Sequence, residues 1–254
     1  MIDLHSHLLP GVDDGSRSVA RSVSILRELV ALGVTDVCLT PHLTASQIGD
    51  GVPAGHDRAF EALTAAAPEG ITLHRGAEVM LDRPLPPSAA SNRSVTLARS
   101  TYLLVEFPRM VASETVERAL RMVAELGLRP LLAHPERYTS CSVSAARRWR
   151  ATGSALQVDA NTLLHRSTRG ERARALLAAG MADILAADNH GDDRSLAAAR
   201  DALLFEGAAA QAALLTVGNP RAILDDQPLT MVEPVTLRLP WMQRIRRLFD
   251  TGET

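Results

Sequence analysis

The 254-residue sequence predicts an α/β fold in which parallel strands and helices alternate to form one barrel-like domain. Apolar, strand-like segments alternate with helical patterns about seven times, which is typical of parallel βα units. The strand segments are continuous apolar runs, as expected for parallel strands buried on both faces. Nearly every one is followed by His, Asp or Glu. A barrel carries functional residues at the C-terminal ends of all its strands, whereas an open sheet concentrates them at one crevice, so the barrel is favoured.

The first unit begins at the N-terminus. Residues 2–7 form an apolar strand in which His5 and His7 lie two apart and therefore on one face. A His-x-His pair on one strand face can bind one metal ion through two imidazoles. Asp13 and Asp14 follow a Pro-Gly turn, which is close enough to bring a carboxylate back over the same ion.

The remaining elements follow from apolar periodicity and from the residues at segment ends. Further strands are predicted over residues 34–40, 71–77, 101–105, 130–133, 155–158 and 182–187. Helices are predicted over residues 16–32, 58–66, 113–126, 144–152, 169–179 and 195–215, with a last short helix within 218–229. Asp14 or Ser16 is the expected cap of the first helix, and Gly33 is expected to end it. Residues 82–94 are rich in Pro and Ser, which indicates a surface loop.

Composition excludes several classes of protein. The net charge of -2 argues against a general nucleic-acid binder. All 27 basic residues are arginine, which excludes Schiff-base chemistry and a phosphate loop with its lysine. The two cysteines, Cys38 and Cys141, have no paired spacing, and this suits a reducing compartment. The sequence has no signal-peptide pattern and no apolar run near the roughly 20 residues of a membrane span, so we expect a cytoplasmic protein.

The strand-end residues form one set of metal-ligand types. They are His5, His7, Asp14, His42, Glu78, Glu106, His134, Asp188 and His190. Five imidazoles and four carboxylates are thus predicted to converge at one mouth of the barrel. Nitrogen and carboxylate ligands without thiolate suit Mn²⁺, Fe²⁺, Zn²⁺ or Co²⁺, and nine ligands exceed the needs of one ion, so two or three ions are expected.

The alternative for any single member of this set is a structural role. Glu106 would then pair with an arginine, and His134 would be a core histidine bonded to a carbonyl. His56, His74 and His165 do not follow predicted strands, and we interpret them as surface or structural residues.

Six segments occur in the order seen in the polymerase and histidinol phosphatase (PHP) superfamily: LHSHLLPGVDDG, LTPH, GAE, EFP, AHPERY and DNH. They most resemble its bacterial capsule-type protein-tyrosine phosphatases, and the first and fifth segments are the specific ones. The resemblance implies a distorted (β/α)7 TIM-like barrel, the PHP fold, as a single domain over residues 1–226. Residues 227–254 would then be a C-terminal extension.

The resemblance also implies a trinuclear metal site, usually active with Mn²⁺, with Mg²⁺ as a further alternative to the metals named above. The first ion would be held by His5, His7, Glu78 and Asp188, the second by Glu78, Glu106 and His134, and the third by Asp14, His42 and His190. Arg137 would bind the substrate phosphate, and Arg194 is similar to a second phosphate-binding, catalytic arginine. The sequence departs from the family pattern at Leu43, at Gly191 and over residues 44–55, all near the substrate mouth.

The resemblance implies a metal-dependent protein-tyrosine phosphatase. Its partner would be a phosphotyrosine protein, namely an autophosphorylated bacterial tyrosine kinase of exopolysaccharide or capsule synthesis, and a homo-oligomer stays open. One alternative keeps the fold but hydrolyses histidinol phosphate or another small phosphoester. Another is a non-catalytic, metal-bound regulatory module.

Two further patterns carry alternatives of their own. Cys141 and Arg147 have the Cys-x5-Arg spacing of cysteine-dependent phosphatases, but no intervening glycine lets the backbone wrap a phosphate, so we interpret the spacing as coincidence. Residues 239–250, LPWMQRIRRLFD, predict a basic amphipathic helix. This helix would either pack on the barrel or a sister subunit, or dock on anionic lipid or a membrane-associated kinase.

Overall fold

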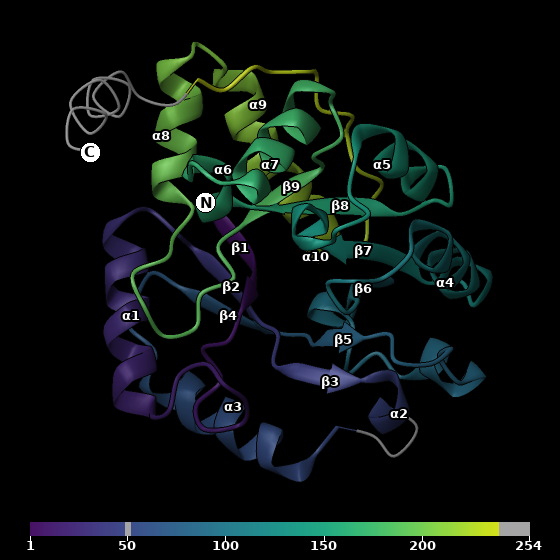
Figure 1. The fold of residues 1–254 in the computed structure, drawn as a ribbon. Helices are drawn as coiled ribbons and strands as arrows, with labels where there is room; N and C mark the ends of the chain where they lie inside the picture. Colours follow the sequence, from purple (N-terminus) through teal and green to yellow (C-terminus); the bar gives the residue numbers. More distant parts are fainter. Residues whose placement is uncertain (49–51, 239–254) are drawn as a thin grey trace, which may run out of the picture.

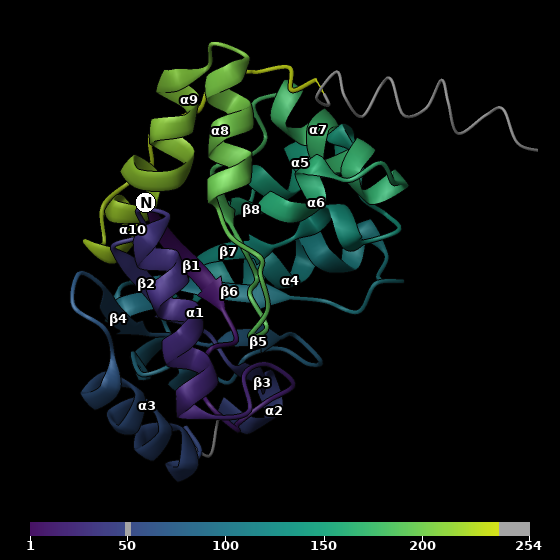
Figure 2. The ribbon, with the colours of Figure 1, turned by 90° about the vertical axis from the view of Figure 1, so that its left-hand side faces the viewer.

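Two parallel sheets lie at the centre of the folded molecule, and the helices surround them (Figures 1 and 2). The computed structural model describes residues 1–48 and 52–238. The first sheet has the order β1 (Ile2–Ser6), β2 (Asp36–Leu39), β4 (Thr72–Arg75). The second has the order β3 (His42–Thr44), β5 (Glu78–Met80), β6 (Tyr102–Glu106), β7 (Arg129–Ala133), β8 (Ala155–Asp159), β9 (Ile184–Ala186).

Helices α1 to α7 lie in the connections between strands, and α8 to α10 follow the last strand. They are α1 (Val19–Ala31), α2 (Ala45–Ile48), α3 (Ala54–Ala66), α4 (Ser113–Glu125), α5 (Val143–Arg150), α6 (Ala160–Leu164), α7 (Thr168–Ala178), α8 (Ala197–Phe205), α9 (Ala209–Ala213) and α10 (Asn219–Leu224). Helix α4 shows how their apolar stripes form the core, because Val116, Leu120 and Val123 are buried at spacings of four and three. They share one apolar cluster with Leu103 and Val105 of β6.

Alternation along β6 places a carboxylate at the centre of the molecule. Leu103 and Val105 pack in the cluster beneath the helices, whereas Leu104 belongs to a second buried cluster with Ile2 and Leu4 of β1. Successive strand residues point to opposite faces, so the residue that ends β6, Glu106, lies on the same face as Leu104. The apolar strand thus ends with an acid on its inner face.

Strand β1 contacts both sheets. It pairs with β2 on one side. On the other side, the N–H of His7 donates to the carbonyl of Asn189 at 2.7 Å, and the N–H of Asp188 donates to the carbonyl of His5 at 3.0 Å. Within the described part of the chain these residues form an isolated parallel bridge, Ser6–Asn189, rather than a continuous ladder. The α/β architecture with parallel sheets is confirmed, but a closed barrel is not.

The break between the sheets has a local cause. The strands predicted over residues 34–40 and 71–77 correspond to β2 and β4, but each is followed by a short strand that was not predicted, β3 and β5. Pro41 lacks the N–H that would continue the β2 ladder. At Gly76, a Cβ would lie 2.9 Å from Leu97 and 3.0 Å from the Cys38 sulfur, so the chain passes the core too closely for a side chain.

Three other predictions need correction. The first helix is capped by Ser18, whose side chain accepts from the N–H of Arg21 at 3.2 Å, and not by Asp14 or Ser16. The predicted helix over residues 195–215 is interrupted at Gly207, where φ is +76°. Helices α2 and α6 were not predicted, because four or five residues are too few for a periodic pattern to appear.

Residues 82–94 are not purely a surface loop. Leu85 and Ala89 are buried in the cluster that contains Val105, and residues 87–91 form a 3-10 turn. Two prolines, Pro84 and Pro87, restrict the backbone of this segment. The loop therefore forms a packed wall against the end of the second sheet.

The start of the C-terminal extension packs on the domain. Val232 and Leu237 are buried, and the N–H of Val235 donates to the carbonyl of Leu177 at 3.3 Å. The predicted amphipathic helix over residues 239–250 lies outside the described residues. Within residues 1–48 and 52–238, no helix has the length and apolar character needed to cross a membrane.

Candidate metal centre and active site

The nine predicted ligand residues lie together. They fall into four overlapping groups whose candidate ligand atoms are within 4.8 Å of one another. The groups are His5, His7 and Asp188; His5, Glu78 and His134; His42, Glu78 and Glu106; and His7, Asp14, His42 and His190. His5 lies within β1, His42 and Glu78 begin β3 and β5, and Glu106 ends β6. The others follow β1, β7 or β9, and Asp14 comes from the loop after β1.

The deepest part of the cluster joins two imidazoles and two carboxylates. Nε2 of His5 lies 3.2 Å from Nε2 of His7. Each of these nitrogens lies 3.2 Å from Oδ1 of Asp188. Oε2 of Glu78 is 3.2 Å from the His5 nitrogen and 3.3 Å from the His7 nitrogen. All four side chains are at most 1% exposed, so the four atoms enclose a small, dry space.

This arrangement fits a metal ion. Oε2 of Glu78 and Oδ1 of Asp188 are buried and have no hydrogen-bond partner among the described residues. An unpartnered buried oxygen is costly, and a bound cation would remove that cost. Imidazole nitrogen and carboxylate oxygen, without sulfur, are the donors that divalent manganese, iron, zinc and cobalt accept.

The electrostatics of the group also favour a cation. Burial opposes charge on His5 and His7, but the carboxylates raise both imidazole pKa values, that of His7 well above its ordinary range. Burial would raise the pKa of Glu78, yet His5 and its neighbours hold it well below the usual carboxyl value. The pKa of Asp188 is lowered in the same way, although burial opposes it. The carboxylates therefore stay ionised and attract positive charge.

Glu78 lies at the centre of the cluster. Its Oε1 is 2.8 Å from Nε2 of His134, and its Oε2 is 3.1 Å from Nδ1 of His42. Oε1 of Glu106 lies 3.3 Å from the same His42 nitrogen. Glu106 thus groups with His42, whereas the family resemblance grouped it with His134. A carboxylate with both oxygens engaged in this way has the geometry of a bridging ligand.

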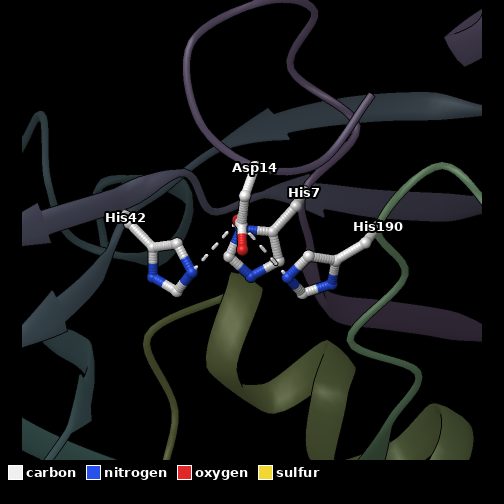
Figure 3. A group of neighbouring side chains, drawn as sticks. All are labelled: His7, Asp14, His42 and His190. Atoms are coloured by element: carbon white, nitrogen blue, oxygen red, sulfur yellow. Dashed lines mark ion pairs between the residues drawn. The ribbon is translucent and has the colours of Figure 1, made fainter. Parts of the chain in front are cut away.

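The outer group opens to solvent. Asp14 lies between the rings of His42 and His190, and its Oδ1 is 3.5 Å from Nε2 of each (Figure 3). The His190 ring stacks on that of His7 with 4.1 Å between centroids. The Asp14 side chain is 69% exposed, which makes this the accessible side of the cluster.

Two polar residues orient the buried imidazoles. Oδ2 of Asp13 accepts from Nδ1 of His7 at 2.8 Å. Oε1 of Gln157 accepts from Nδ1 of His5 at 3.0 Å and from the N–H of His134 at 3.2 Å. The bonds from the Nδ1 atoms of His5 and His7 place the proton of each ring on Nδ1 and leave Nε2 facing the cluster. Sequence reasoning missed Gln157, although a lone amide inside the apolar segment ALQVD was a usable signal.

Two residues of the cluster have left-handed backbones. His134 has φ +33° and Asp188 has φ +51°. Non-glycine residues seldom adopt this conformation, and it is concentrated at functional sites. His134 follows β7 directly and Asp188 lies two residues after β9, so in both cases the turn redirects the side chain over the strand end.

A cavity of about 290 Å³ adjoins the cluster. Its lining residues are Asp14, His42, Glu78, Glu106, Phe107, Arg109, His134, Arg137, Tyr138, Asp188, His190 and Arg194. Arg137 and Arg194, the two arginines predicted to bind phosphate, therefore both line this cavity. Nη2 of Arg137 donates to Oδ2 of Asp159 at 2.6 Å and also contacts Asp188. Nε of Arg194 donates to Oδ2 of Asp192 at 2.8 Å.

Arg109, Phe107 and Tyr138 were not predicted to line the site. The side chain of Arg109 is exposed and has no hydrogen bond or ion pair within the described residues. The Tyr138 hydroxyl donates to the carbonyl of Ala133 at 2.9 Å, and burial raises its pKa well above the ordinary value. Tyr138 thus joins the end of β7 to the cavity wall and is not a proton donor to the cavity.

The residues set aside in the sequence lie elsewhere. Nε2 of His74 pairs with Oδ1 of Asp36 at 2.9 Å, His56 is buried, and His165 is exposed. Within the described part of the chain, none of the three belongs to a ligand group.

The cysteine alternative is not supported. Burial raises the pKa of Cys141 to about 12, so the thiol stays protonated at neutral pH. Arg147 is exposed on α5, whose N-terminus is capped by the side chain of Ser142 at 3.1 Å from the N–H of Ala145. Neither Cys141 nor Arg147 lines the cavity.

The matching family model and the relatives named tyrosine-protein phosphatases agree with one another. A family model described as capsular polysaccharide synthesis, CpsB/CapC, matches residues 1–225. The tyrosine-protein phosphatase CpsB of Streptococcus pneumoniae is 26% identical over 241 residues, which cover 89% of this chain and 99% of that protein. YwqE of Bacillus subtilis, also named a tyrosine-protein phosphatase, is 30% identical over 139 residues, or 54% of this chain and 55% of YwqE.

The putative tyrosine-protein phosphatase CapC of Staphylococcus aureus is 26% identical over 54% of each chain. In these matches with YwqE and CapC, the chain spans about half the length of the relative.

Solved structures agree on the fold. One comes from crystal structures of YwqE and CpsB, described as unique metal-dependent tyrosine phosphatases. It covers 93% of this chain and 100% of its own, with a TM-score of 0.76 and 22% identity. A mutant organophosphorus hydrolase from Deinococcus radiodurans matches with a TM-score of 0.57 at 15% identity, over 88% of this chain and 92% of its own. With its model matched over residues 1–225, the chain belongs to the CpsB/CapC family of capsular polysaccharide synthesis.

Proposed function

We propose that this protein is a metal-dependent phosphomonoester hydrolase that acts as a protein-tyrosine phosphatase. One observation carries the proposal: nine imidazole and carboxylate side chains converge beside a cavity that three arginines, Arg109, Arg137 and Arg194, also line. Such a cluster binds divalent metal ions, and guanidinium groups bind phosphate. Relatives of similar architecture are named tyrosine-protein phosphatases, which supports the choice of substrate class.

The metal is proposed to be Mn²⁺, with two or three ions bound to each chain. His5, His7, Glu78 and Asp188 would hold the buried ion, and Asp14, His42 and His190 the exposed one. The family resemblance assigns Glu78, Glu106 and His134 to a further ion. In the structure Glu78 groups with His134 and His5 on one side and with Glu106 and His42 on the other. The absence of sulfur among these donors supports Mn²⁺ or Fe²⁺ as well as Zn²⁺, Co²⁺ or Mg²⁺, so metal content must decide among them.

The reaction is the attack of water on phosphorus, with cleavage of the P–O bond to the tyrosine side chain. Bound metal ions would supply hydroxide at neutral pH and polarise the phosphoryl oxygens. Both carboxylate contacts of Arg137 use Nη2, which leaves its Nε and Nη1 to donate to two oxygens of one phosphate. Arg194 would donate to the same group from its own side of the cavity. Asp159, at 2.6 Å, keeps the Arg137 guanidinium directed into the cavity.

The physiological partner is proposed to be a phosphotyrosine protein, specifically a bacterial tyrosine kinase of capsule or exopolysaccharide synthesis. Membership in a capsular polysaccharide synthesis family supports this choice. Histidinol phosphate and other small phosphoesters are the substrates to test against it.

We also propose that the two sheets are parts of one distorted (β/α)7 TIM-like barrel over residues 1–226. The hydrogen bonds from Asp188 and His7 to the other edge support closure, since they bring the end of β9 beside β1. Residues 227–254 would form an extension of this domain, and the family model ends at residue 225.

The test is hydrolysis by the full chain after chelation and after Mn²⁺ is added back. Release of phosphate from a phosphotyrosine peptide, dependent on Mn²⁺, is the expected result. Release from histidinol phosphate alone would keep the metal site and change the substrate. Chelator-insensitive release would contradict the metal mechanism, and no turnover with any divalent metal would favour a regulatory module.

A further inference from the structure

An apolar groove lies next to the cavity. It has a volume of about 450 Å³ and runs between helix α4 and the packed loop that follows β5. Its lining residues are Leu81, Asp82, Arg83, Pro84, Leu85, Pro87, Phe107, Thr115, Arg118, Ala119, Met122, Val123, Glu125 and Leu126. This volume is in the range found for pockets that bind small ligands.

The groove and the catalytic cavity share a wall. Phe107 lines both, and it directly follows Glu106, one of the metal-cluster carboxylates. The N–H of Leu81 donates to the carbonyl of Glu106 at 3.0 Å, so the loop side of the groove is joined to the same strand end. The cavity and the groove therefore adjoin at Phe107.

Local sequence explains why the depression forms. On α4, Thr115, Ala119 and Met122 lie at spacings of four and three, so they form one stripe on the helix surface. Thr115 and Ala119 are small, and Met122 remains 38% exposed, which is unusual for a large apolar side chain beside a core. On the opposite side, Pro84 and Pro87 restrict the backbone of the loop.

We propose that this groove binds the substrate polypeptide next to its phosphorylated residue, and that it accepts an apolar side chain of that segment. The inference rests on the proposed phosphatase function, because a phosphate in the cavity fixes where the rest of the substrate must pass. The rim carries two arginines and two acids, Arg83, Arg118, Asp82 and Glu125. Because these charges balance, we expect the groove to prefer an apolar side chain of the substrate over a charged one. Arg109, which lines the cavity, supplies an unpaired positive charge near the phosphate.

Binding can be measured without turnover. The probes are two fluorescent peptides that carry a non-hydrolysable phosphonate in place of phosphotyrosine, one with leucines flanking it and one with glycines. We expect the native full chain to bind the leucine peptide about tenfold more tightly, since burying one leucine is worth roughly that factor. Met122→Glu and, separately, Ala119→Arg are expected to remove this preference.

Met231→Glu is the matched control, because Met231 is another exposed methionine, 69% exposed, and lies outside the groove. It should keep the tenfold preference. Equal binding of the two peptides by the native chain, or a preference that survives both groove variants, would overturn the proposal. Hydrolysis of 4-nitrophenyl phosphate by the native chain is measured in parallel. A leucine preference without any such hydrolysis would reject the phosphatase function and leave the groove assignment standing.

Discussion

The side-chain oxygen of Gln157 accepts a hydrogen bond from Nδ1 of His5 at 3.0 Å, within an interior from which water is excluded. The bond selects one tautomer of His5 and holds the ring with Nε2 toward Glu78 and Asp188. Partners of this kind raise the metal affinity of the imidazole they orient.

Gln157→Leu should therefore lower the affinity of the buried site for Mn²⁺ by about 10- to 100-fold. Metal titration followed by calorimetry measures this directly, and metal content by mass spectrometry gives a second readout. Gln211→Leu, the same change on α9, should leave the affinity as in the native chain. Equal affinities of the two variants for Mn²⁺ would contradict the proposed role of Gln157 in orienting His5.

Arg137→Ala should reduce kcat/KM for a phosphotyrosine peptide by about 100-fold, because a preorganised donor to the reacting group is lost. Arg137→Lys should restore little of it, since an ammonium lacks the planar fork that spans two phosphate oxygens. Metal content of both variants should match that of the native chain. If Lys restores full activity, Arg137 supplies only positive charge.

Gly15 and Gly55 should respond to the same substitution with opposite signs. A Cβ at Gly15 would lie 2.0 Å from the carbonyl oxygen of His7, whereas none of the described atoms lies within 4 Å of one at Gly55. Gly15→Ala is expected to destabilise the protein by about 1–3 kcal/mol and to displace the loop that carries Asp14. Gly55→Ala should stabilise α3 by about 0.5–1 kcal/mol. Denaturant unfolding measures both, and equal effects would contradict the structure.

Asp36 should contribute stability that depends on pH. Burial alone would raise its pKa, but the hydrogen bond from His74 and the charge of Arg221 lower it. A lowered folded-state pKa means that the stabilisation is present above the unfolded value, near 3.9, and is lost as pH falls through the folded value. Asp36→Asn should therefore cost about 1 kcal/mol at pH 7 and progressively less below about pH 4.

Unfolding by urea at several pH values measures this dependence. Asp201→Asn is the control, because that side chain is 62% exposed and, among the described residues, pairs with the neighbouring Arg200 alone. A loss at Asp36 that does not change with pH would show that its ionisation contributes nothing.

Cys141→Ser should leave kcat and KM for phosphotyrosine peptides within about twofold of the native values. The thiol is buried and its pKa is raised to about 12, so it cannot provide a thiolate at neutral pH. Alkylation by iodoacetamide at pH 7.5 should be slow for the same reason. Loss of activity in the variant, with metal content intact, would revive the cysteine mechanism.

The sequence predicted the alternation of the longer strands and helices, although not the short elements β3, β5, α2 and α6. It also predicted that nine polar residues lie together, because each of them lies in or after an apolar segment whose end must meet its neighbours. Residue Glu106 illustrates this, since period-two alternation along β6 alone places it inward. The break between β4 and β5 was not predictable, because Gly76 is required by contacts with Leu97 and Cys38 that come from distant segments.

The supporting residues were also beyond reach of local reasoning. Asp159 and Asp188 meet Arg137 from two different strands, and only the assembled sheet shows that they share one guanidinium. Arg109 and the groove beside α4 depend on how a loop packs against a helix surface. Such relationships depend on tertiary packing, which no periodic pattern in the sequence encodes.

The bridge between β1 and the residues after β9 has a consequence for synthesis on the ribosome. The buried group joins His5 and His7 to Asp188, which are separated by more than 180 positions along the chain. A nascent chain therefore cannot assemble this group until nearly the whole domain has emerged. We expect metal capture to be a late step that follows folding, so the finished fold, with its fixed geometry, determines which metal is bound.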